Sequence, residues 1–84
     1  MNESIAVPKG QKARVMMYLM RFGSITPLDA MREFGIMRLA AVIFELRDDY
    51  EIETKMEEST NRFGEPVQYA RYTLIGEKET RDDR

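Results

Sequence analysis

The chain has 84 residues, of which 13 are basic and 15 are acidic, and its net charge at pH 7 is −2. This length predicts a single domain with a small core and little room for a buried active site. The chain contains no cysteine and no histidine, which excludes disulfides, thiolate catalysis and the common zinc sites. We therefore expect no enzymatic activity, no metal site and no cofactor.

Basic and acidic side chains are unevenly distributed along the chain. Residues 1–47 carry seven basic and four acidic side chains, whereas residues 48–84 carry six and eleven. Such an asymmetry can orient a protein on DNA or present a polar face to a protein partner. The apolar runs are much shorter than the roughly 18 residues that cross a bilayer, and residues 1–4 do not resemble a signal peptide. We expect a cytoplasmic protein with no membrane contact.

The N-terminal part of the chain predicts a short arm followed by a helix. Residues 1–8 lack periodicity and are expected to form a flexible arm. Residues 9–22 have apolar side chains at helical spacing, among them Val15 and Leu19. Gly23 follows the last apolar residue and is expected to end the helix, as a glycine after a helix commonly does.

The next segment predicts a second helix with clear start and stop signals. Residues 24–25 are too short for an independent strand, and we expect them to pair with the edge of a later sheet. Thr26 is a favourable N-cap, Pro27 suits the first helical position and Asp29 suits the first turn. Gly35 is expected to end this helix after about two turns.

The rest of the chain predicts a third helix and a hairpin. Residues 36–48 form the expected helix, and residues 51–56 and 67–75 alternate like two strands around a polar, turn-rich loop. Residues 76–84 read as a charged, disordered tail. The expected core face of the third helix consists of Ile36, Leu39, Ala40, Ile43 and Leu46.

The order of these elements predicts the fold. A short helix, a glycine turn and a second helix between residues 26 and 47 are typical of a helix-turn-helix. A hairpin follows the third helix directly. The sequence therefore predicts an α+β fold over residues 9–75, a winged helix-turn-helix in which three helices are followed by a two-stranded β-hairpin wing.

Several sequence segments together resemble a known family. They are residues 11–15, 23–30, 35–41, 45–47, 61–64 and 69–74. In combination they resemble small helix-turn-helix domains that are common in bacteriophage and prophage genomes. The resemblance implies a winged helix-turn-helix fold and a DNA-binding, transcription-regulating role in a phage or prophage. It also implies a viral protein that acts in the cytoplasm of a bacterial host cell, with a homodimer as one arrangement left open.

The candidate DNA contacts are basic and polar side chains near the helix starts and on the wing. Arginine is the commonest reader of guanine in the major groove, helix N-termini and basic side chains hold phosphates, and a wing tip can reach a minor groove. On that basis we expect DNA to be contacted mainly by the helix 36–48 and the wing 57–67. The candidates are Arg38 for a base, Asn61 and Arg62 for the wing contact, and Lys12, Thr26 and Arg32 on the two preceding helices for phosphates. The alternative is that these are ordinary surface and turn residues, with Phe63 packing the loop onto the sheet.

The expected outer face of the third helix leaves a second function open. That face carries Met37, Arg38, Ala41, Phe44, Glu45 and Asp48. Either Met37 and Phe44 pack against the wing or the second helix, or they form an exposed apolar patch suited to a protein partner or a dimer. The alternative function is a protein-binding module, in which Met37, Phe44, Glu45 and Asp48 form the interface of a phage factor that binds and inhibits a host protein or defence complex.

Acidic residues gather at the end of the third helix and on the first hairpin strand. They are Asp48, Asp49, Glu51, Glu53, Glu57 and Glu58. Strand alternation divides them between two faces, so we do not expect a metal site, which needs converging oxygen atoms. They read as a charged strand edge, or as a surface that mimics nucleic acid or docks on a basic protein, with Arg71 balancing part of the charge.

Overall fold

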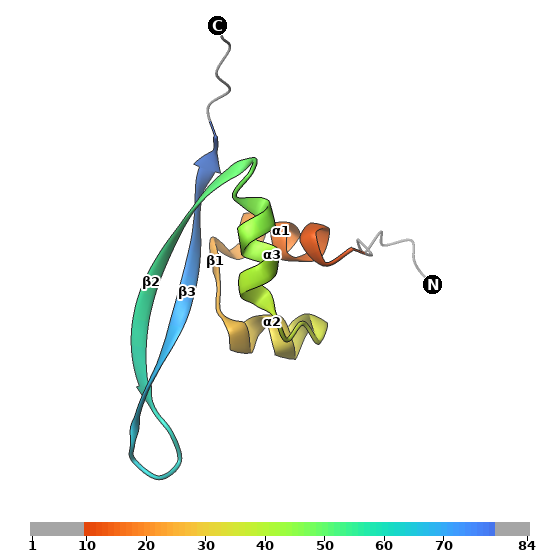
Figure 1. The fold of residues 1–84 in the computed structure, drawn as a ribbon. Helices are drawn as coiled ribbons and strands as arrows, with labels where there is room; N and C mark the ends of the chain where they lie inside the picture. The colour runs from red at the N-terminus through yellow and green to blue at the C-terminus, as the bar shows by residue number, and fades with distance from the viewer. Residues whose placement is uncertain (1–9, 79–84) are drawn as a thin grey trace, which may run out of the picture.

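Three short helices pack beside one end of a long β-hairpin. The computed structural model describes residues 10–78 of the chain. The elements in order are α1 (Gln11–Phe22), β1 (Ser24–Ile25), α2 (Pro27–Phe34), α3 (Leu39–Leu46), β2 (Tyr50–Thr60) and β3 (Pro66–Glu77). The loop between β2 and β3 projects well past α2, away from the helices (Figure 1). The predicted arm 1–8 and residues 79–84 of the predicted tail lie outside the described residues.

The ends of α1 and α2 are placed by the residues that predict them. Gly23 and Gly35 adopt left-handed backbone conformations, with φ of 89° and 68°, directly after α1 and α2. The Asp29 amide donates to Thr26 Oγ1 at 3.1 Å, and the Thr26 amide donates to Asp29 Oδ2 at 3.0 Å. This capping box satisfies two backbone donors that the first turn of α2 would otherwise leave unpaired.

The third helix is shorter than predicted. It begins at Leu39 instead of residue 36 and ends at Leu46 instead of residue 48. After Gly35 the chain needs residues 36–38 to turn between the two helices, and Arg38 has a non-helical backbone with φ −119° and ψ 60°. At the other end, residues 47–49 form a turn that leads into β2.

The sheet has three antiparallel strands in the order β1-β3-β2. As predicted, residues 24–25 pair with the edge of the later sheet, where Ser24 lies opposite Thr73. The hairpin is longer than predicted, because its ladder runs from the Tyr50–Glu77 pair to the Thr60–Pro66 pair. The strand β3 thus includes Gly76 and Glu77, so the prediction that a disordered tail begins at residue 76 is wrong.

The core lies where the helices meet the base of the hairpin. The face that α3 buries is rotated relative to the prediction: Ala40 is exposed, whereas Val42 is buried. The reason is that α1 packs against the side of α3 that carries Val42. The buried hydrophobic residues are Val15, Met16, Leu19, Ile25, Ala30, Ile36, Leu39, Val42, Ile43, Leu46, Ile52 and Tyr72.

Candidate nucleic-acid interface

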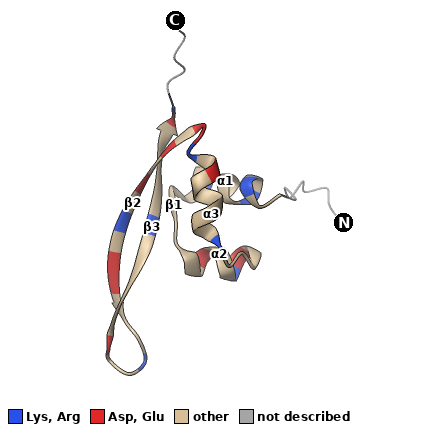
Figure 2. Cartoon of the chain, in the orientation of Figure 1, with Lys and Arg blue, Asp and Glu red and all other residues tan. Residues whose placement is uncertain are grey.

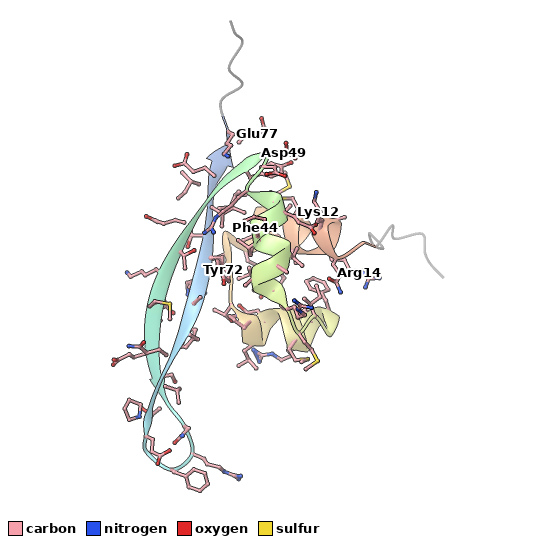
Figure 3. All side chains as sticks on the ribbon, in the orientation of Figure 1. Lys12, Arg14, Phe44, Asp49, Tyr72 and Glu77 are labelled. Carbon is pink, nitrogen blue, oxygen red and sulfur yellow. The ribbon has the colours of Figure 1, made fainter. Side chains whose placement is uncertain are left out.

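The outer face of α3 is apolar and lacks basic side chains. The exposed residues of this helix are Ala40, Ala41, Phe44 and Glu45. Phe44 is 76% exposed, and Met37 in the preceding turn is 79% exposed. The alternative in which these two side chains pack against the wing or α2 is therefore wrong. Met37 thus lies exposed just before α3 and Phe44 lies exposed in its second half, and Figure 3 labels Phe44 on that helix.

Two of the predicted DNA-contacting residues line one hollow beside this face. The hollow is open, has a volume of about 490 Å³, and lies between the first turn of α1 and the outer side of α3. Lys12 lines it from α1, Arg38 lines it from the turn before α3, and Glu45 lines it from α3. Among residues 10–78, neither Lys12 nor Arg38 forms an ion pair. The fold thus brings together two cations that are 26 positions apart in the sequence.

The two candidates on α2 differ in accessibility. The Arg32 side chain is 63% exposed, and its Nη2 atom lies 3.7 Å from Asp29 Oδ1. A pair this exposed leaves the guanidinium available to a phosphate, because exposed ion pairs are weak. Thr26 is only 5% exposed, and its hydroxyl oxygen caps α2. We therefore assign Thr26 to helix capping and leave it out of the candidate phosphate contacts.

The loop of the wing contains fewer residues than predicted, and hydrogen bonds of the Asn61 side chain hold its shape. Residues 61–65 form the loop, whereas the other residues of the expected wing 57–67 are paired in the ladder. Asn61 Oδ1 accepts hydrogen bonds from the amides of Phe63 and Glu65 at 2.9 and 3.0 Å, and Nδ2 donates to Glu65 Oε1 at 3.0 Å. The Asn61 side chain is thus engaged within the loop and acts as a positioning residue.

The same loop presents a cation and an aromatic ring at its tip. Phe63 is 77% exposed, so the alternative in which it packs the loop onto the sheet is wrong. The guanidinium carbon of Arg62 lies 6.0 Å from the centroid of the Phe63 ring. Figure 2 shows basic segments on α1, at the start of α3 and at this tip, which lies far from the helices.

The order and connections of these elements match a known domain family. The turn of residues 35–38 joins α2 to α3, and a hairpin follows directly. The winged helix-turn-helix domain family matches residues 10–77. The chain belongs to this family. Its three helices and wing hairpin confirm the predicted fold, and β1 adds a third strand to the sheet. No curated protein and no solved structure matches the chain. Winged helix-turn-helix domains are typically non-enzymatic DNA-binding modules, so membership indicates DNA binding.

One arginine of this winged helix-turn-helix domain serves the fold. Arg47 follows α3, and its Nε donates to the Ile52 carbonyl oxygen at 3.1 Å. Its Nη2 atom donates to Thr54 Oγ1 on the same strand. Arg47 therefore ties the end of α3 to β2. The basic residues on either side of α3 have different tasks, because only Arg38 lies beside the open hollow.

A second internal arginine joins all three strands of the sheet. Arg71 on β3 donates from Nε to Glu57 Oε1 on β2 and from Nη1 to Ser24 Oγ on β1, each at 3.0 Å. The Arg71 guanidinium holds the pKa of Glu57 below its usual range, and the same contact raises the pKa of Arg71. The prediction that Arg71 balances part of the acidic cluster is confirmed at Glu57.

The other acidic side chains of the predicted cluster do not converge on a metal site. Within residues 10–78, no group of three or more acidic side chains is arranged to hold a metal ion. In that same part of the chain, no helix has the length and apolar character that crossing a membrane requires.

Proposed function

We propose that this chain is a sequence-specific DNA-binding regulatory protein of phage or prophage origin, acting in the cytoplasm of a bacterial host. The observation that carries the proposal is the pairing of Lys12 and Arg38 on one open hollow beside α3. The family supports DNA binding. The resemblance of the sequence segments to prophage domains supports the origin and the regulatory role.

The proposed complex uses the two ends of the molecule differently. The helix α3 enters the major groove, where Arg38 donates hydrogen bonds to the O6 and N7 atoms of a guanine. Lys12 and Arg32 bind phosphates on either side of that groove. Arg62 reaches the neighbouring minor groove, on a loop held in shape by Asn61.

We further propose that two copies bind one operator. A two-fold dimer places its recognition helices in successive major grooves, which makes the operator a near-palindrome with half-sites about one helical turn apart. Light scattering on the free protein and on its DNA complex measures the stoichiometry. One protein per operator duplex contradicts this part of the proposal.

The test is binding to the DNA upstream of the protein's own gene at about 50 and 200 mM salt. Wild-type protein is expected to lose affinity steeply as salt rises. Replacing Lys12, Arg32 or Arg62 by alanine is expected to reduce the slope of log K against log salt by about one each. Arg38→Ala is expected to relax base preference at one position, a loss of about 1–3 kcal/mol.

Lys55 provides the matched control, because it is a cation on the exposed side of β2, outside the proposed contacts. Lys55→Ala is expected to leave the salt slope unchanged. Absence of salt-sensitive binding by the wild type contradicts the proposed function.

A second candidate function rests on the exposed apolar surface. Met37 and Phe44 are largely exposed, Glu45 is exposed on α3, and Asp48 is exposed in the turn that follows it. This surface fits a phage factor that binds and inhibits a host protein or defence complex. A host protein retained by the wild type but not by a Met37→Ala, Phe44→Ala double variant supports this alternative. Failure to retain any host protein, with normal DNA binding, contradicts it.

A further inference from the structure

The side chains of α3 offer very little hydrogen bonding to a DNA base. Between Leu39 and Leu46, Glu45 is the only side chain with a hydrogen-bonding group. Most major-groove readers use arginine, lysine, asparagine or glutamine at such positions. If α3 lies in the major groove, which this inference takes from the proposed function, most of its contacts with bases must be apolar.

The exposed apolar side chains of α3 lie together on one face. Phe44 is three residues after Ala41 and four after Ala40, so the three share a helix face. Helical side chains lean toward the N-terminus of their helix, so the Phe44 ring extends over the two alanines and away from Asp48. The alanines are small enough to let the helix backbone approach a groove floor closely, and the Phe44 ring rises above them.

The charges around this face favour nucleic acid as its occupant. Lys12 and Arg38 border α3 on the side of the open hollow, and they complement the phosphates that line a major groove. Glu45 borders the same hollow, and a carboxylate at this position can accept a hydrogen bond from the N4 amino group of cytosine. Glu45 is the one charged side chain among the exposed residues of α3, and the hydrogen bond to cytosine would offset its repulsion by phosphates.

We propose that α3 reads the C5-methyl groups of pyrimidines, with Phe44 as the main contact and Ala41 beside it. The C5-methyl group is the apolar feature that a base presents in the major groove, and alanine and phenylalanine are known chemical partners for it. Thymine carries this group, and 5-methylcytosine carries it at the same position. Arg38 supplies the hydrogen-bonded contact with a neighbouring guanine.

The test uses the full 84-residue chain and duplexes that it selects from two random-sequence pools. One pool contains thymine and ordinary cytosine, and the other contains 5-methylcytosine in place of cytosine. Selected duplexes are then remade with uracil in place of thymine, or with cytosine in place of 5-methylcytosine, and the two Kd values are compared. Each change removes a methyl group and leaves every hydrogen-bonding atom of the base in place.

Removal of a contacted methyl group is expected to weaken binding about fourfold. Phe44→Ala is expected to bind the methylated and unmethylated duplexes with the same Kd. Met20→Ala on α1 is the matched control, because it removes a similarly exposed apolar side chain from another surface. It is expected to keep both the wild-type Kd and the fourfold ratio.

The outcomes separate this inference from the proposed function. Sensitivity to uracil identifies thymine as the base that is read, and sensitivity to loss of 5-methylcytosine identifies the modified base. Equal affinity for all forms, with normal salt-dependent binding, overturns the methyl contact and leaves the proposed function standing. Recovery of no duplex from either pool overturns both.

Discussion

The recognition helix and the wing loop hold their shapes by different means. The helix α3 is anchored by the burial of Leu39, Val42, Ile43 and Leu46, and the exposed side chains of its outer face do not belong to the core. The loop of residues 61–65 buries almost nothing and is held by hydrogen bonds to Asn61. The first surface depends on the whole core, whereas the second depends on hydrogen bonds within the loop, most of which involve Asn61. Perturbations of the two surfaces should therefore have effects of different size and reach.

The largest expected effect comes from two adjacent residues of α3. Ile43 is 1% exposed, so Ile43→Ala leaves a cavity and is expected to lower the free energy of unfolding by about 2–5 kcal/mol. Phe44→Ala, at a largely exposed site, is expected to change it by less than about 0.5 kcal/mol. Urea denaturation measures both. Equal losses for the two variants mean that Phe44 is packed, which contradicts the exposed surface described above.

Two glycines with the same backbone requirement sharpen the comparison. Gly35 and Gly64 have φ of 68° and 81°, and an added Cβ meets nothing within 4 Å at either position. Gly35→Ala is expected to cost about 1–2 kcal/mol, because the turn is fixed between two packed helices. Gly64→Ala is expected to cost less, because the exposed loop can rearrange. Thermal unfolding of both variants tests this, and a larger loss at Gly64 contradicts it.

A smaller effect on stability is expected from the residue that organises the wing loop. Asn61→Ala removes the acceptor for the Phe63 and Glu65 amides, at a cost of at most about 1 kcal/mol because the loop is exposed. Hydrogen exchange at those two amides should accelerate, while core amides keep their protection. Asn61→Asp, which retains the acceptor oxygen, is the control. Accelerated exchange throughout the core means that the loop and the core are coupled.

The smallest expected effect is a pH dependence at the base of the wing. Arg71 lowers the pKa of Glu57 from its ordinary value of 4.5. The ion pair therefore stabilises the fold above that pH and is lost as the pH falls through the lowered pKa of the folded state. Melting temperatures of wild type and Glu57→Gln, measured between neutral pH and about pH 3, should converge at the acid end. Parallel curves contradict a contribution from this pair.

The local features of the fold were predictable, and the features that depend on packing were not. Thr26 acts through a hydroxyl that accepts from an amide three residues on, and Gly23 and Gly35 act through their own backbone, so these roles follow from residue type and position. The exchange of Ala40 for Val42 in the core could not be predicted, because the rotation of an eight-residue helix is set by its neighbour α1. Periodicity over so few residues leaves that angle open.

The hairpin and the candidate site show the same limit. Residues 57–60 are polar and resemble a turn, yet they pair along the ladder, where Glu58, Ser59 and Thr60 remain exposed. The meeting of Lys12 and Arg38 depends on how α1 crosses α3. The exposed Phe63 could have been anticipated from the spacing of Asn61 and Gly64, since a loop closed by an asparagine leaves little reach for packing.

Because β1 is short, it supports the wing only near the helices, and the outer part of the hairpin projects beyond that support. This strand pairs only with Tyr72 and Thr73, so β3 has no strand on that side from Ala70 to Pro66. At about 3.4 Å per residue, the outer hairpin extends on the order of 17 Å beyond Arg71. A rotation of a few degrees at that support displaces the tip by an ångström or more. In the proposed DNA complex, a rotation of this size lets the tip adjust to grooves of different width.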